Sequence, residues 1–428
     1  MAEIKPFFGI KYNPEKIKDL SLVITQPYDK ITPQMQEEYY KRHPYNFVRL
    51  ILGKSQDRYQ ESYENYHKWQ RERILIKDER PGIFPYTQEF EIEGERRIRK
   101  GFIAALRLYD FEEGIVLPHE RTHSKPKEDR YRLFIRTKKN YEQVFMLYSD
   151  PENKINSILE EVFRKKPEIE ARGEYGVIHR MWSIYDPEII RSIARLMEDK
   201  ILLIADGHHR YETSLRVRNE LKQYVPFYSG KECFNYRMVT FVNMYDEGLV
   251  ILPTHRLFKR IPVDFDEFIK KSADYFDIEK ISKANIEEEV KKYRDKHAYG
   301  IYRKDDGYIF ILKDASVMKK LLPDRSDEYR NLDVSILHAV VVENLLGISK
   351  NELEDVIDYE RYTQNVIEKV DKGDYVVGII MNPTRPEEVQ QVALKRERMP
   401  QKSTDFYPKL VSGLVIFDIS PDEVIPEV

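Results

Sequence analysis

The segment from Tyr175 to Met244 constrains the fold most, because strand-like and helix-like stretches alternate along it. Short continuous apolar runs are typical of buried strands, and apolar residues at helical spacing are typical of helices that cover them. The predicted strands are Met181–Ile184, Ile201–Ile204 and Met238–Met244, and the predicted helices are Pro187–Met197 and Arg210–Tyr224. This order predicts a compact βαβαβ core and an α/β fold class of mixed α+β character.

The chain has 428 residues, which is too long for one ordinary hydrophobic core. We therefore expect additional mixed-sheet domains around the central segment. The expected division is an N-terminal mixed α/β region (1–150) that carries a polar active-site loop, the core (151–247), and a C-terminal α/β domain (248–428).

Composition excludes several classes of protein. The net charge is −3, whereas a general nucleic-acid binder would show a strong basic excess. Cys233 is the single cysteine, so neither an internal disulfide nor a thiolate zinc cage is expected. No secretory signal is visible, and no apolar stretch approaches the ~20 residues that span a bilayer. We expect a cytoplasmic protein with no nucleic-acid or membrane partner, and the oligomeric state stays open.

The most informative motif follows the predicted strand at Ile201–Ile204, where Asp206, Gly207, His208, His209 and Arg210 lead into a helix. The first turn of a helix has outward N–H groups and a partial positive charge, so basic residues there cost about 0.3–1 kcal/mol. A bound phosphate would offset this charge and use the same N–H groups. The other interpretation is structural, with Asp206 as a cap and the histidines on the surface or in the core.

A second cluster occupies the predicted polar loop from Leu117 to Arg130. His119 and Glu120 could exchange a proton with a reacting group, and basic side chains could hold phosphate oxygens. The remaining candidates in this loop are Thr122, Lys125, Asp129 and Arg130. The letters His-Glu-x-x-His also occur, but prolines bracket them and leave hardly two helical turns, so no zinc is expected. A solvated charged loop is the alternative.

Further candidates lie near both ends of the chain. Lys402, Ser403, Thr404 and Lys409 combine hydroxyls with lysines, which suits phosphate oxygens, although the run is otherwise an ordinary turn. Three other residues could line a cleft: Tyr28, Asp29 and His255. Asp29 is at least as well explained as a turn former.

Three motifs in order resemble a widespread prokaryotic family that is described only as a domain of unknown function. They are Asp206-Gly-His-His-Arg-Tyr-Glu-Thr213, Leu117-Pro-His-Glu-x-Thr122 and Lys402-Ser-Thr-x-Phe-Tyr-Pro-Lys409. Members are often encoded beside the serine-biosynthesis dehydrogenase and transaminase, which implies a role in serine metabolism. The central segment is also similar to the ParB/sulfiredoxin-like fold, which includes an ADP-dependent free-serine kinase. That resemblance implies that residues 207–210 contact phosphate.

The resulting hypothesis is a phosphate-handling enzyme that acts on a small hydroxy-amino acid, either a phosphatase or a nucleotide-dependent kinase. His208 and His209 would then act beside His119 and Glu120 as catalytic groups. Mg²⁺ and ATP or ADP are the expected cofactors if a nucleotide participates. The alternatives are a non-catalytic regulator that binds a small anionic ligand and a ParB-like nucleotide switch.

Overall fold

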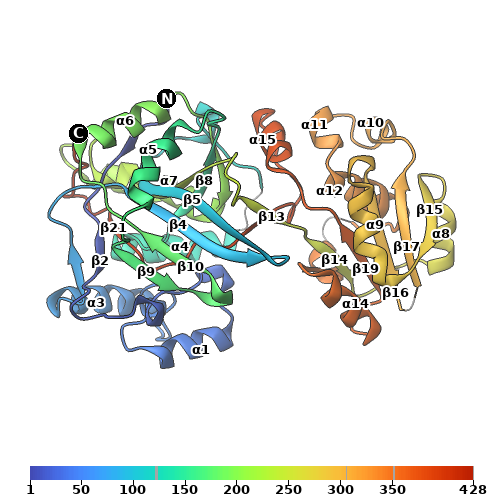
Figure 1. Cartoon of the computed structure of the whole chain (residues 1–428), viewed down its shortest axis with the longest axis horizontal. Coiled ribbons are helices and arrows are strands. Elements are labelled where there is room, and N and C mark those ends of the chain that lie inside the picture. Colours follow the sequence, from blue (N-terminus) through green and yellow to red (C-terminus); the bar gives the residue numbers. More distant parts are fainter. Residues whose placement is uncertain (121–123, 305, 350–351, 428) are drawn as a thin grey trace. The chain divides into compact units, whose positions relative to one another are not determined.

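The computed structural model describes residues 1–120, 124–304, 306–349 and 352–427. The chain divides into two compact units (Figure 1). The first unit contains residues 1–118, 122–250 and 408–428, and the second contains residues 119–121 and 251–407.

The first unit is built on a nine-stranded mixed sheet. Its strands run in the order β6 (Val116–Leu117), β11 (Leu202–Asp206), β8 (Val144–Tyr148), β12 (Tyr236–Asn243), β5 (Glu95–Arg107), β4 (Phe84–Ile92), β10 (Ile178–Met181) and β9 (Ile169–Arg172), and β1 (Ile4–Lys5) pairs with the end of β5. The β6–β11 and β8–β12 pairs are parallel, and the other pairs are antiparallel. Each of β8, β11 and β12 is almost entirely buried, as their continuous apolar runs predict.

Helices cover this sheet through apolar stripes. In α5 (Lys154–Phe163) and α6 (Pro187–Met197) the buried residues recur at helical spacing, and they join one core with the sheet. Figure 1 shows these two helices on one side of β4 and β5, with α1 and α3 on the other. The other helices of the unit are α1 (Pro33–Arg42), α2 (Val48–Ile51), α3 (Arg58–Arg71), α4 (Ser124–Thr137) and α7 (His208–Leu221).

The second unit has a six-stranded sheet whose neighbours are all antiparallel. The order is β15 (Phe276–Ile281), β17 (Asp306–Leu312), β16 (Ala298–Arg303), β19 (Val377–Met381), β14 (His255–Phe258) and β18 (Ile357–Glu360). Its core gathers apolar residues of the sheet, α9 (Ile286–Lys292) and α14 (Thr363–Asp371). The remaining helices are α8 (Phe265–Ser272), α10 (Val317–Leu321), α11 (Asp327–Arg330), α12 (Asp333–Ile336), α13 (Leu353–Val356), α15 (Pro386–Leu394) and a π-helix (Leu337–Leu345).

The mixed α/β class is confirmed, but the strands of the predicted βαβαβ core are not neighbours. β8 lies between β11 and β12, and β4 and β5 separate β12 from β10. Strands from the predicted segments 1–150 and 151–247 therefore alternate within one sheet, and the C-terminal 21 residues join the same unit. The predicted division into three consecutive domains therefore differs from the two observed units. The reason is that strand pairing joins segments that are distant in sequence.

The prediction of a polar loop over 117–130 is wrong from Ser124 onward. Helix α4 begins there and extends to Thr137. The helix forms because Arg130, Leu133, Phe134 and Thr137 recur on its buried face. Pro126 lies in the first turn of the helix, where backbone N–H groups have no partner within the helix, so the missing N–H of proline removes no hydrogen bond. Within the described ranges, no helix is both long and apolar enough to cross a membrane.

Candidate functional site

The predicted phosphate motif lies at the junction between β11 and α7. Gly207 is the N-cap of α7 and has a φ of 94°, a conformation that glycine adopts without strain. A Cβ at this position would lie 3.1 Å from Nε of Arg210, so the guanidinium packs directly against the turn. The first turn contains His208, which is 7% exposed, and the half-buried His209. It contains no acidic residue, in contrast to α8, whose first turn carries Asp266 and Glu267.

Asp206 is paired with two cations at this junction. Its Oδ2 accepts a hydrogen bond from Nη2 of Arg210 at 2.7 Å, and its Oδ1 lies 3.5 Å from Nζ of Lys409. Burial alone would raise the pKa of this carboxyl, but the charges of Lys409, Arg210 and Lys30 together hold the pKa well below its usual range. Asp206 is therefore ionised near neutral pH and is a poor general base.

Arg210 is buried and serves the protein's own structure. Besides Asp206, its guanidinium donates to the main-chain oxygen of Gln143. Burial lowers the pKa of Arg210, but nearby Asp206, Glu142 and Asp29 more than offset this effect and raise it. The predicted phosphate-binding arginine is thus already held by a carboxylate and a carbonyl.

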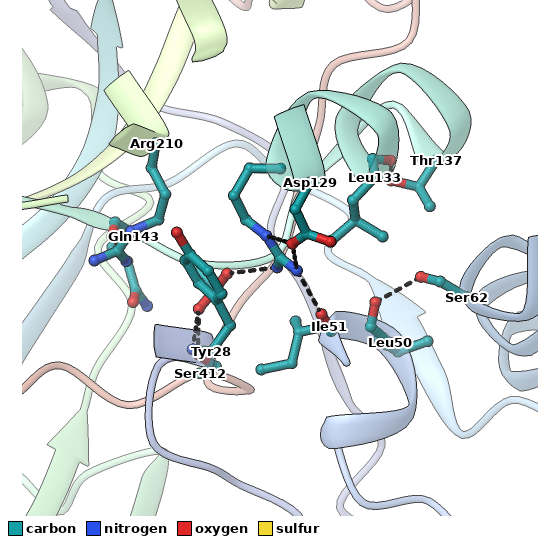
Figure 2. Close-up of polar contacts among 12 residues, drawn as sticks. Tyr28, Leu50, Ile51, Ser62, Asp129, Leu133, Thr137, Gln143, Arg210 and Ser412 are labelled. Carbon is teal, nitrogen blue, oxygen red and sulfur yellow. Dashed lines mark hydrogen bonds and ion pairs between the residues drawn. The ribbon is translucent and has the colours of Figure 1, made fainter. Parts of the chain in front are cut away.

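A second buried network surrounds Arg130. Its Nε donates to Oδ2 of Asp129 at 2.7 Å, its Nη2 donates to the Ile51 oxygen at 3.0 Å, and its guanidinium lies 3.9 Å from the ring centroid of Tyr28. Asp129 also accepts from Nη2 of Arg58 at 2.6 Å. Figure 2 shows Tyr28, Asp129 and Arg210 in this region. Burial alone would raise the pKa of Asp129, but Arg130 and Arg58 lower it overall.

Glu142 belongs to the Arg130 network, acts electrostatically on Arg210, and was not predicted from the sequence. Its Oε1 accepts from the Tyr28 N–H at 3.0 Å and from the Ser412 hydroxyl at 3.4 Å, and its Oε2 lies 3.4 Å from Nη1 of Arg130. Only a charged residue next to an apolar strand marks this position in the sequence, which is too weak a pattern to identify a site.

Arg237 is the second unpredicted member. It is fully buried at the start of β12 and donates one hydrogen bond, to the main-chain oxygen of Glu142. Its Nε and Nη1 have no hydrogen-bond partner among the residues that the structure describes. Burial and the nearby charge of Arg210 lower the pKa of this guanidinium to about 9. A single arginine within the apolar run 236–244 is the only sequence feature that points to it.

The segment Tyr28–Lys30 forms a short 3₁₀ helix near the same junction. Asp29 contributes to the field at Arg210, and Lys30 contributes to the field at Asp206. The first unit thus brings together Tyr28, Asp29, Asp129, Arg130, Asp206, Gly207, His208, His209, Arg210 and Lys409 from the predicted set.

Other predicted residues cluster in the second unit. Nε2 of His119 lies 2.8 Å from the hydroxyl of Thr404, which lies 3.3 Å from Oε1 of Glu120. An ionised carboxylate only accepts hydrogen bonds, so Thr404 donates to Glu120 and accepts from the Nε2–H of His119. His119 is fully buried, and its main-chain oxygen accepts from the Met399 N–H at 2.7 Å.

Three more candidates of the second unit have positions typical of structural residues. Lys402 is exposed, with a φ of 56°. Ser403 donates to the Pro400 oxygen. His255 is 2% exposed, and both ring nitrogens are engaged, by the Met381 N–H at 3.1 Å and the Thr363 hydroxyl at 3.3 Å. Burial lowers the pKa of His255 to about 4, so the ring is neutral.

Thr122 and the side chain of Lys125 lie outside the described residues, and so does the second histidine of the His-Glu-x-x-His run. Among the residues that are described, no group of three or more His, Cys, Asp or Glu side chains could hold a metal ion.

A family profile described as "Protein of unknown function (DUF1015)" matches residues 4–335, well over half of the chain. The chain belongs to the DUF1015 family. This membership agrees with the expected family of unknown function, although the matched residues end before the third motif at 402–409. No curated protein matches the chain.

Solved structures show only a weak likeness to this DUF1015 protein. A free serine kinase mutant in complex with ADP has 12% identity and a TM-score of 0.38, with 73% of this chain and 91% of that chain covered. A conserved hypothetical protein from Pyrococcus furiosus has 14% identity and a TM-score of 0.33, with coverage of 70% and 92%. C-terminally truncated SbnI from Staphylococcus aureus has 9% identity and a TM-score of 0.35, with coverage of 73% and 86%. Such scores establish neither a ligand nor a reaction.

Proposed function

We propose that the first unit binds a phosphate-bearing small molecule at the N-terminus of α7 and that the chain is a phosphoryl-transfer enzyme. The observation that carries this proposal is the first turn of α7, where two imidazoles replace the usual acidic residues and Lys409 and Lys30 act on the same carboxylate. A phosphate would complement both the helix terminus and the basic side chains around it.

The residues have different roles in this proposal. Arg210 and Asp206 hold the strand-to-helix turn in place, because they are bound to each other. His208 and His209 offer N–H donors and are the candidates for proton transfer, since the pKa of Asp206 is too low for a base. Lys409 supplies positive charge from the third sequence motif.

The proposed substrate is a small hydroxy-amino acid such as serine or its phosphate ester, as the sequence resemblance implies. In the kinase direction the donor would be ATP or ADP with Mg²⁺, and in the phosphatase direction water would accept the phosphoryl group. A non-catalytic regulator is the second candidate. It is favoured by the binding of Arg210 and Arg130 to the protein's own carboxylates, because such arginines are less available to a transferring phosphate.

The test measures binding and turnover separately. Isothermal titration calorimetry with phosphoserine should show saturable binding to the wild type and a loss of at least about tenfold in affinity for His209→Gln. His67→Gln is the matched control, because His67 is also half-buried but lies on α3. Phosphorus NMR then follows phosphoserine alone and serine with ATP or ADP. Binding without product would support the regulator, and unchanged affinity in His209→Gln would refute the site.

A further inference from the structure

The second unit contains a pocket of about 390 Å³ that the function proposed above does not use. Its wall comes from the π-helix Leu337–Leu345, the preceding segment 322–335, Tyr359 of β18 and the segment 398–401. Pockets for small organic ligands have volumes of roughly 300–1,000 Å³. The space therefore suits a small molecule rather than a macromolecular segment.

The π-helix is an unusual element to find in such a wall. It extends over nine residues, and His338, Ala339 and Glu343 from it line the pocket. π-helices are rare, usually occupy a single turn and are frequent at functional sites. The sequence pattern predicts an ordinary buried helix over 335–346, so the altered winding coincides with the pocket wall.

The polar groups of the lining favour an anionic ligand. Arg325, Arg398 and one carboxylate, Glu343, line the pocket. Nη1 of Arg325 also lies 3.3 Å from Oε1 of Glu397, so Arg398 is the main cation of the lining and Arg325 adds an N–H donor that is already paired. Ser335 also lines the pocket, is 1% exposed, and its hydroxyl has no hydrogen-bond partner within the described ranges. A buried hydroxyl without a partner destabilises the fold, and a ligand that hydrogen-bonds to Ser335 would remove this penalty.

The remaining lining favours a ligand with a planar ring. Tyr329 and Tyr359 present aromatic rings, and the guanidinium of Arg325 lies 4.7 Å from the ring centroid of Tyr329. Leu322 and Met399 add apolar surface. Aromatic and guanidinium planes stack well on flat organic groups.

We propose that this pocket is a binding site for a small organic anion that carries a planar ring. The ring lies among Tyr329, Tyr359 and the apolar side chains, and the anionic group faces Arg398 and Arg325. The pocket wall is also bonded to the loop of the predicted catalytic residues, because the N–H of Met399 donates to the His119 oxygen at 2.7 Å.

The test uses the full chain and four probes in isothermal titration calorimetry. 4-Hydroxybenzoate and phenyl phosphate carry a ring with a carboxylate or a phosphate, 4-hydroxybenzamide is the neutral analogue, and succinate is an anion without a ring. Saturable binding of at least one aromatic anion, with at least about tenfold weaker binding of the other two probes, is the expected result. If neither aromatic anion binds saturably, the proposal is overturned.

Variants assign the binding to this pocket. Arg398→Gln should lower the affinity for the aromatic anion by at least about tenfold. Arg396→Gln, two residues away and outside the lining, should leave this affinity unchanged. Ala339→Trp should abolish binding by filling the space, with circular dichroism to show that the fold is kept. Binding that is equal in the wild type and Arg398→Gln would overturn the assignment. His209→Gln affects only the α7 site, so failure of one site does not imply failure of the other.

Discussion

At the α7 junction, the chemistry of each basic side chain depends on its partners. Arg210 and Arg130 are fixed by Asp206 and Asp129, so they shape the site from within the protein. The two histidines occupy the helix turn itself. Sequence reasoning could name these residue types, but it could not separate structural arginines from ligand-binding groups, because pairing depends on geometry across distant segments.

Replacement of Asp206 tests whether its ion pair with Arg210 stabilises the fold. Asp206→Asn should destabilise the fold by about 2–3 kcal/mol near pH 7, since Arg210 loses a buried ionic partner. The pKa of the Asp206 carboxyl is lower in the folded than in the unfolded protein. Its contribution to the free energy of unfolding is therefore present above the unfolded pKa of about 4, and it is lost as pH falls through the folded pKa. Urea unfolding from pH 7 to pH 3 should show the difference narrowing in acid. A constant difference would contradict this account.

Asp246 should respond to pH in the opposite sense. Burial raises its pKa to about 6, although N–H groups of Lys100 and Gly248 donate to it at 3.3 and 3.0 Å. Its contribution is fully present below the unfolded pKa of about 4 and is lost as pH rises through 6. Asp246→Asn should therefore stabilise the protein by about 2–3 kcal/mol at pH 8 and have little effect at pH 4. Urea titrations at both pH values measure this, and a larger gain at pH 4 would refute it.

Among the elements, the β11–α7 unit was predicted almost completely from sequence. A buried apolar run, Asp-Gly and a helical pattern give a strand, a turn and a helix, and the structure has β11 at Leu202–Asp206 and α7 at His208–Leu221. The local sequence is sufficient here because the spacing of apolar residues within each element indicates whether it is a strand or a helix.

Gly207→Ala tests this turn. The positive φ should cost about 1–2 kcal/mol, and the new Cβ would also meet the guanidinium of Arg210 at 3.1 Å. Gly230→Ala is the matched control, because Gly230 has a φ of 83° and nothing within 4 Å of its Cβ position. Urea unfolding should therefore show a larger loss for Gly207→Ala. Equal losses would mean that Arg210 moves aside without cost.

One other element was not predicted, and a second was predicted as a buried helix but without its winding. Residues 124–130 were expected in a loop because charged residues and prolines dominate, but packing of Leu133 and Phe134 extends a helix over them. The buried helix at 335–346 begins as α12 and continues as the π-helix. Apolar content identifies a buried helix, but its winding depends on the packing around it.

For the whole molecule, the C-terminal segment is the clearest case of long-range dependence. Residues 408–428 belong to the first unit although 157 intervening residues, 251–407, belong to the second. β21 (Phe417–Asp418) pairs with β7 (Lys139–Asn140), and single bridges join Ile416 to Ile10 and Ser412 to Thr25. The first unit therefore depends on residues 408–428 for its packing.

Truncation after Tyr407 should prevent the first unit from folding. It removes eight apolar side chains that are at most 5% exposed, namely Leu410, Val411, Leu414, Val415, Ile416, Phe417, Ile419 and Ile425. At about 1.5–3 kcal/mol each, their loss is comparable to or larger than the ~5–15 kcal/mol that stabilises a typical domain. Limited proteolysis should show rapid cleavage between residues 1 and 250. A control that ends at Pro426 should resist, and a resistant first unit in the shorter chain would contradict this view.

The sequence by itself determined the mixed α/β class, the strand–turn–helix at 201–221 and the membership of a family of unknown function, because these depend on local patterns of residues. Only the tertiary structure decided which strands are neighbours, that Glu142 and Arg237 join the buried network, and that Arg210 is held by Asp206. The physical reason is that strand pairing and the burial of charge are interactions between residues far apart in the chain, and no local pattern encodes their partners.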